Sequence, residues 1–119
     1  MRILSDILYK GVRVMTVNTL KLSTISEYLG TVDYGKVAGR SIAEMWDTSY
    51  QIICDFDNVH GMTGAFADEA FGRMFTEKGS EEFTDKIRFY NLNELVEAIL
   101  KGTLYQRYKD LKNPGHWSI

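Results

Sequence analysis

The chain has 119 residues, of which 45% are hydrophobic, and it contains a single proline. This length and composition suit one compact domain and exclude a disordered chain. Fourteen Lys and Arg residues against sixteen Asp and Glu residues leave a formal net charge of −2, so the overall charge does not attract nucleic acid. Cys54 is the only cysteine, which excludes an internal disulfide and a cysteine-based metal cage. No run reaches the ~18 apolar residues of a membrane span, so we expect a cytoplasmic protein without a membrane partner.

Residues 1–19 are predicted to form a strand or hairpin extension. Apolar and polar side chains alternate over residues 3–17, on either side of Lys10-Gly11, as in a hairpin that joins residues 3–9 to residues 12–17. Such strands would lie at the edge of a sheet, and an exposed edge can pair with a second copy of the chain. We therefore expect a homodimer through this segment.

Residues 20–110 are predicted to form the main domain. A short strand is expected at residues 20–22, followed by one or two turns of helix up to Gly30, because Thr24 and Glu27 match a capping box.

Residues 31–35 have the composition of a loop, and the first main helix is expected after it. Its buried face is predicted to carry Val37, Ala38, Ile42, Met45 and Trp46.

The centre of the chain is predicted to form a strand, a tight loop and a helix. Residues 52–56 are nearly all apolar, which suits a strand in the middle of a parallel sheet. Residues 57–64 contain the Asx and Gly residues that allow a tight turn. In the helix that follows, the buried face is predicted to carry Phe66, Ala70, Phe71, Met74 and Phe75. The outer, solvated face is predicted to carry Asp68, Glu69 and Arg73.

The last third of the chain is predicted to add one strand and one helix. Residues 76–85 are polar and suit an exposed connection, and residues 86–90 suit a strand. Asn91 with Glu94 matches a second capping box, so the last helix is expected to start there and to end near Lys109. Its inner face is predicted to carry Leu95, Val96, Ile99 and Leu100. Residues 111–119 are expected to form a tail.

The alternation of strand and helix predicts an α/β fold, a mixed sheet with parallel core strands and packed helices.

Residues 53–72 resemble the bacterial STAS-like family. Members of that family tend to show an Asp-Phe-x-x-Val strand end, here Asp55 to Val59, then a short loop with hydroxyl residues, and a helix that contains Phe-Gly, here Phe71-Gly72. The resemblance extends over roughly residues 20–108 and implies a fold like that of anti-sigma-factor antagonists. It also implies a non-catalytic domain that docks onto partner proteins, often ATPases of the histidine-kinase type.

Some STAS domains are switched by phosphorylation of a serine at the start of the helix after the central strand. In this chain Gly64 occupies that place, and Thr63 is the hydroxyl that remains. A phosphate on Thr63 would lie near exposed N–H groups and the positive end of the helix dipole. The simpler interpretation is that Thr63 caps the helix.

The candidate partner-binding surface is the loop and the first helical turn, within residues 57–71. Its predicted residues are His60, Met62, Thr63, Gly64, Asp68 and Glu69. Asp57 and His60 could also serve a small enzyme as an acid–base pair, but no nucleophile stands near them in the sequence. Two ligands are too few for a metal centre, and the glycines lack a phosphate-binding motif, so we expect no metal and no cofactor.

The function predicted from the sequence is regulation of a partner protein by surface docking. An alternative is a phage or mobile-element inhibitor of a host complex, and another is the small enzyme. Residues 105–112 interleave aromatic and basic side chains, a pattern that can bind nucleic acid, but Asp110 and the net acidity argue against this. Trp117 is a further candidate anchor for another chain.

Overall fold

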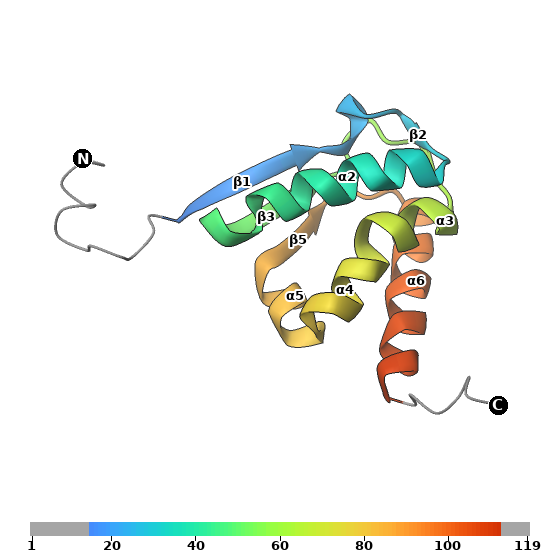
Figure 1. Cartoon of the computed structure of the whole chain (residues 1–119). Helices are drawn as coiled ribbons and strands as arrows, with labels where there is room; N and C mark the ends of the chain where they lie inside the picture. Colours follow the sequence, from blue (N-terminus) through green and yellow to red (C-terminus); the bar gives the residue numbers. More distant parts are fainter. Residues whose placement is uncertain (1–14, 113–119) are drawn as a thin grey trace, which may run out of the picture.

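The computed structural model describes residues 15–112, and Figure 1 shows how their strands and helices are arranged. The strands are β1 (Thr16–Lys21), β2 (Tyr28–Leu29), β3 (Ser49–Asp55), β4 (Gly61–Met62) and β5 (Ile87–Tyr90). The helices are α2 (Val32–Met45), α3 (Gly64–Ala67), α4 (Arg73–Lys78), α5 (Ser80–Lys86) and α6 (Glu94–Lys112). Two 3-10 turns, η1 (Leu22–Thr24) and η2 (Trp46–Thr48), and one π-helical turn, η3 (Asp68–Gly72), complete the list. Most of the hairpin predicted for residues 3–17 lies outside the described residues, as does Trp117.

Three strands form the main sheet, in the order β1-β3-β5, and both pairs run parallel. Ile52 in β3 pairs with Ile87 in β5 and with Asn18 in β1. A parallel pair requires a crossover, which α2 supplies before β3 and the helices α3 to α5 supply before β5. The predicted α/β class with parallel core strands is confirmed. Among the described strands every pair is parallel, so the antiparallel pair that a mixed sheet requires is not found in this part of the chain.

The strand β1 runs through Asn18 and Thr19, which lie between the separate strands predicted at residues 12–17 and 20–22. The amide of Asn18 donates a 2.7 Å hydrogen bond to the hydroxyl of Ser49, so a side chain that suggests a turn is satisfied inside the sheet. The helix predicted for residues 23–30 is also wrong. The hydroxyl of Thr24 donates to the carbonyl of Lys21 and does not cap a helix, so only the short turn η1 forms.

The helix α2 begins at Val32, inside the predicted loop 31–35. Thr31 is its N-cap, and its hydroxyl accepts a 3.1 Å hydrogen bond from the backbone N–H of Tyr34. Ala38, Ile42 and Trp46 are buried as predicted, but Val37 is 43% exposed.

Gly35, which suggested a loop, lies within α2 because the helix passes very close to the π-helical turn there. A Cβ atom on Gly35 would stand 2.8 Å from the Cβ of Glu69, a separation that real side chains do not tolerate. The glycine therefore permits helix packing and does not mark a turn.

The segments α3, η3 and α4 form one continuous helical stretch after the loop. The residues predicted to face the core are all buried: Phe66, Ala70, Phe71, Met74 and Phe75. Phe66 and Phe71 are five residues apart, and a π-helical turn brings residues at this spacing onto one side. The turn η3 therefore keeps both rings in the core, where their centroids lie 6.2 Å apart.

The connection predicted at residues 76–85 contains the helix α5, so this prediction is wrong. The missed residue is Phe83, which is 1% exposed. Its ring lies 5.4 Å from that of Phe75 and 6.2 Å from that of Phe89. A single apolar side chain in a polar stretch gives no helical period, but its burial anchors α5 against the sheet.

The helix α6 begins after Asn93, not after Asn91. The side chain of Asn93 accepts a 2.8 Å hydrogen bond from the N–H of Val96, which makes Asn93 the N-cap. Asn91 has a positive φ of 62° and donates its amide to Asp55, so the predicted capping box with Glu94 is wrong. Of the predicted inner face, Val96 and Leu100 are buried and Ile99 is partly buried, whereas Leu95 is 59% exposed.

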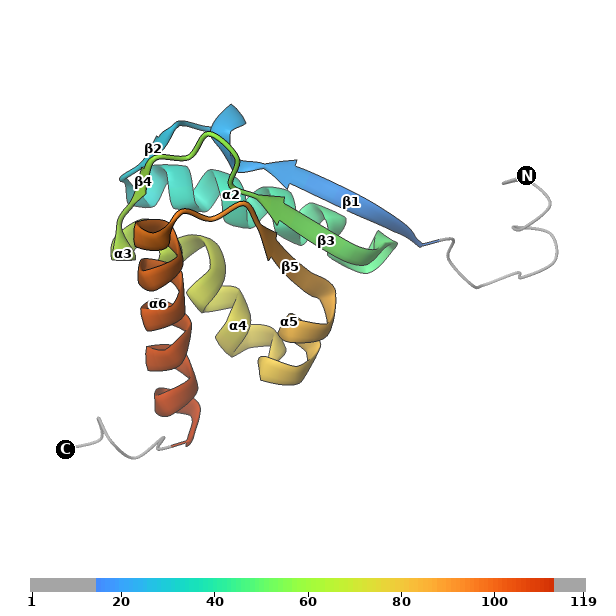
Figure 2. The ribbon, with the colours of Figure 1, turned by 180° about the vertical axis from the view of Figure 1, so that it is seen from behind.

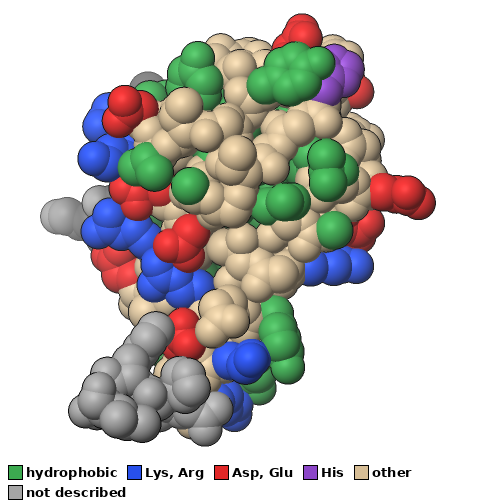
Figure 3. Space-filling view, turned by 90° about the vertical axis from the view of Figure 1, so that its right-hand side faces the viewer, with side chains coloured by type: hydrophobic (Ala, Val, Ile, Leu, Met, Phe, Trp, Pro, Cys, Tyr) green, Lys and Arg blue, Asp and Glu red, His purple; other side chains and the backbone are tan. Residues whose placement is uncertain are grey.

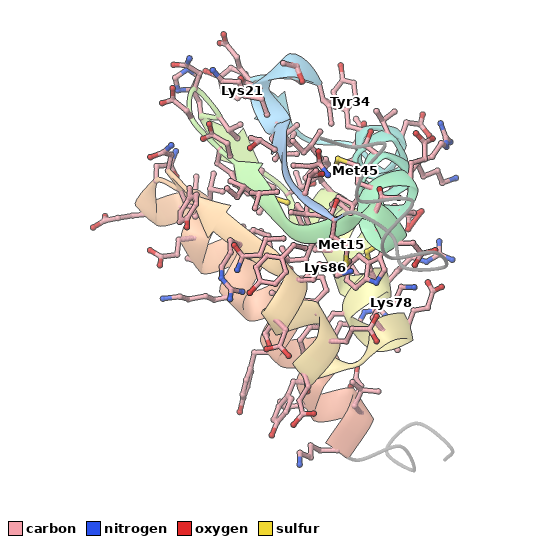
Figure 4. All side chains as sticks on the ribbon, turned by 90° about the vertical axis from the view of Figure 1, so that its left-hand side faces the viewer. Met15, Lys21, Tyr34, Met45, Lys78 and Lys86 are labelled. Atoms are coloured by element: carbon pink, nitrogen blue, oxygen red, sulfur yellow. The ribbon has the colours of Figure 1, made fainter. Side chains whose placement is uncertain are left out.

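The helices cover one side of the main sheet. In Figure 2 the strands β1 and β3 lie in front of α2 with β5 below them, and no described helix crosses the near side of the three strands. At the end of the sheet where β3 begins, the ring of Trp46 lies 5.1 Å from the ammonium group of Lys78 and 5.2 Å from that of Lys86, on the side shown in Figure 4. The indole N–H of Trp46 donates to Glu82, so this cluster ties α2, α4 and α5 together.

Candidate functional site

The loop between β3 and α3 is held by backbone hydrogen bonds. The strand β4 pairs with β2, the N–H of His60 donates to the carbonyl of Glu27 at 2.8 Å, and the N–H of Thr63 donates to that of Leu29 at 3.0 Å. From the other side, the amide of Asn93 donates to the carbonyls of Val59 and His60, both at 3.2 Å. The loop thus has a defined shape while its side chains remain exposed.

The exposed side chains of this loop and of β2 form a small surface, which we call the loop surface and define as Glu27, Tyr28, His60, Thr63 and Gly64. Tyr28 is 66% exposed, and its ring centroid lies 5.6 Å from that of His60. The Nε2 atom of His60 lies 3.6 Å from a carboxylate oxygen of Glu27. The three side chains therefore support one another while still facing solvent.

Thr63 and Gly64 complete the loop surface at the start of α3. The hydroxyl of Thr63 accepts a 3.1 Å hydrogen bond from the N–H of Phe66, so the predicted helix cap is confirmed. A Cβ atom on Gly64 would meet nothing within 4 Å, so the backbone is open to an approaching molecule at this point.

An apolar groove of about 360 Å³ adjoins Gly64, between the start of α3 and the helix α6. Its lining residues are Gly64, Asp68, Ala98, Ile99, Gly102, Thr103 and Gln106. Figure 3 shows this side of the molecule, with the histidine beside a hydrophobic side chain at the top and a largely uncharged area below them. The loop surface and the groove are thus continuous.

Three of the predicted binding residues are not freely available. Met62 is 6% exposed and belongs to the core. Glu69 has a side chain that is only 12% exposed and forms an ion pair with Arg73 at 3.0 Å. The prediction of a solvated face is therefore wrong for Glu69, whereas the side chain of Asp68 is 45% exposed but paired with Arg107.

Asp68 instead holds α6 in place. Its carboxylate accepts two hydrogen bonds from the guanidinium of Arg107, at 2.7 and 2.8 Å. The hydrogen bond from Arg107 lowers the pKa of Asp68, and the pair raises the pKa of Arg107. A Cβ atom on Gly72 would collide with the carboxylate of Asp68, so the glycine leaves room for the pair of Asp68 and Arg107.

The residues considered for catalysis do not form a site in the described structure. No hydrogen bond or ion pair joins Asp57 to His60 in residues 15–112, and His60 faces Glu27 and Tyr28. Burial raises the pKa of Cys54 to about 12, so its thiol is not a ready nucleophile. Within the same residues, no group of three or more His, Cys, Asp or Glu side chains could hold a metal ion.

A larger hollow of about 600 Å³ lies beside the beginning of β3, next to α5. Several charged groups in its wall already have internal partners. Glu82 accepts from Trp46, Lys86 donates to the carbonyl of Trp46 at 2.7 Å, and Arg88 donates to the carbonyl of Thr84. We therefore attribute these side chains to the packing of α5.

Sequence reasoning missed Tyr28, Ala98 and Gly102 as surface residues of this region. Tyr28 had been placed in a helix, and Ala98 and Gly102 have no side chain that suggests binding. A glycine in the middle of a helix costs about 1 kcal/mol relative to alanine, and this cost was the signal that could have singled out Gly102.

The geometry defines an α/β domain with a short parallel sheet, helices on one side and a loop–helix surface at the carboxyl end of the strands. Residues 39–97 match the family described as STAS-like domain of unknown function (DUF4325). The resemblance noted from the sequence is therefore confirmed over this segment, which carries a STAS-like domain. No curated protein and no solved structure matches the chain. No helix among residues 15–112 is both long enough and apolar enough to cross a membrane.

Proposed function

We propose that this protein is a non-catalytic interaction module that regulates a partner protein by docking through the loop surface and the adjoining groove. The observation that carries the proposal is the combination of exposed side chains with a rigid frame. Tyr28 is 66% exposed on backbone that β2 and β4 hold by pairing. A site with an ordered backbone binds its partner at a low entropic cost, because little of the loop has to become ordered on binding.

The family match supports a protein partner, because STAS-like domains act mostly by docking onto other proteins. Kinase-like ATPases are the partners that this resemblance favours. The loop surface suits such a contact, since Tyr28 and His60 offer a pair of exposed rings in contact and Gly64 admits the partner close to the backbone.

The first test is a pull-down from native cells with the wild-type protein, followed by mass spectrometry and by titration of the purified partner in a calorimeter. Gly64→Arg should block binding, because the arginine side chain would fill the open space beside Gly64 at the edge of the groove. Ala43→Arg is the matched control, since Ala43 is exposed on α2, away from the loop. Equal affinity of both variants and the wild type would show that the partner binds elsewhere.

Genomic neighbours distinguish the proposed regulator from the phage-type inhibitor. A gene for a kinase-like ATPase next to this one supports regulation, whereas surrounding phage genes support an inhibitor of a host complex. Both proteins would use the same surface, so the pull-down serves either case.

Phosphorylation of Thr63 would add a second level of control. Thr63 is an exposed residue and its hydroxyl caps the helix, so a phosphate would lie beside the N–H of Phe66. Mass spectrometry of protein from native cells tests this: a phosphate found on other residues while Thr63 stays unmodified would reject it.

A further inference from the structure

The helix α6 has two apolar faces, of which only one is buried by the domain. Val96 and Leu100 face the core. The opposite face carries Leu95, Ala98, Gly102 and Tyr105, and all four are exposed. Leu95 is 59% and Tyr105 is 63% exposed, so two large apolar side chains of this face contact solvent.

The spacing of this second face is that of a helix–helix contact. Leu95, Ala98, Gly102 and Tyr105 follow one another at intervals of three, four and three residues, which is the alternation that places side chains along a coiled-coil seam. The small residues Ala98 and Gly102 lie in the middle, where two crossing helices approach most closely. We call this face the α6 stripe.

The charges along α6 indicate which helix fits the stripe. The first turns carry Glu94 and Glu97, and the last turns carry Lys109 and Lys112. A helix with the same layout that runs in the opposite direction would place its basic end against this acidic end, and the helix dipoles would also be opposed. Lys101 near the centre pairs with Glu97 of its own chain at 3.1 Å, so Glu94 carries the acidic charge of this end toward the partner.

We propose that the partner of the α6 stripe is a second copy of this chain, packed antiparallel through α6. Ala98 of one copy faces Gly102 of the other, and Leu95 faces Tyr105. Such a contact is isologous, because the same stripe serves on both copies. The stripe spans roughly 15 Å at ~1.5 Å per residue, so the area is small and the dimer depends on protein concentration.

Ala98 and Gly102 also line the groove beside Gly64. Self-association and partner docking at the groove would therefore exclude each other. The two proposals remain separable, because the dimer is measured on the purified chain alone.

The test combines sedimentation of the full chain over a range of concentrations with disulfide cross-linking. Cys54 is buried, so introduced cysteines are the reactive ones among the described residues. A mixture of Ala98→Cys and Gly102→Cys proteins should form the cross-linked pair, since the two positions face each other within disulfide reach. A mixture of Ala98→Cys and Ala43→Cys proteins is the control and should not cross-link beyond background.

Leu95→Lys combined with Tyr105→Lys should weaken the dimer roughly 10-fold or more, while circular dichroism stays that of the folded protein. Val37→Lys is the matched control, because Val37 is an exposed apolar side chain on α2. A monomer at every concentration would overturn the proposal, as would a dimer that survives the double variant and so uses another surface, such as the edge segment at residues 3–17. Preferential cross-linking of Ala98→Cys to itself would overturn the antiparallel arrangement.

Discussion

The aromatic core and the loop surface adjoin one another, but they are held in different ways. In the core, the ring of Phe71 lies 6.1 Å from that of Phe56 and 5.2 Å from that of Phe89, so side-chain packing supplies the order. On the loop surface the backbone is fixed by hydrogen bonds from Thr63 and Asn93, and the side chains are exposed. The comparison indicates that stability resides in the core, and we propose recognition for the loop surface, so substitutions should separate the two.

The largest effect is expected in the core. Phe71→Ala should lower the free energy of unfolding by ~3–5 kcal/mol, because it removes a ring that touches three other aromatic rings and leaves a cavity. Denaturant unfolding measures the change. Tyr50→Ala is the control, since Tyr50 is an aromatic residue with 67% exposure. Equal losses in the two variants would show that aromatic packing is not what distinguishes the core.

A smaller effect is expected where α6 joins the π-helical turn. Asp68→Asn should destabilise the fold by ~1 kcal/mol at neutral pH, a modest value because the side chain of Asp68 is 45% exposed and its ion pair is screened. The pKa of Asp68 is lowered in the folded state, so its stabilising contribution is complete above the ordinary aspartate pKa of roughly 3.9.

This contribution is lost as the pH falls through the lowered value, so the wild type and Asp68→Asn should converge in acid. Unfolding curves between neutral and acidic pH measure the difference. Asp57→Asn is the control, because Asp57 is an exposed aspartate outside the ion pair with Arg107. A difference that stays constant with pH would mean that the ion pair with Arg107 does not contribute.

The smallest effect on stability is expected on the loop surface. Tyr28→Ala and His60→Ala should each change the free energy of unfolding by less than ~0.5 kcal/mol, because both side chains are exposed and the backbone hydrogen bonds remain. Capture of the partner should fall in both variants. A large loss of stability would contradict the separation of the two regions, since the ring pair would then be part of the core.

Local sequence patterns correctly predicted those helices, strands and caps that depend on residues close together in the chain. The apolar run of β3 and the period of Phe66, Ala70 and Phe71 were sufficient for a buried parallel strand and the helix after it. Thr63 was predicted as a cap because capping is a contact between neighbours in the chain, and the structure confirms it.

Tertiary contacts decided the features that local patterns predicted wrongly. Asn18 continues a strand because Ser49 satisfies its amide, and Phe83 forms a helix because Phe75 and Phe89 bury its ring.

The candidate site divides in the same way. Gly64 was found from the turn that it begins, whereas Tyr28 belongs to the site only because β2 and β4 pair. The charge of Asp68 suggests a side chain that contacts only solvent. In the fold, Arg107 from a distant part of the chain donates a hydrogen bond to the carboxylate of Asp68. The sequence by itself therefore determined the strand–helix order and the position of the loop, since these depend on period and on neighbouring residues. Which side chains are free to bind was decided only when distant segments came together, because exposure is a property of packed surfaces.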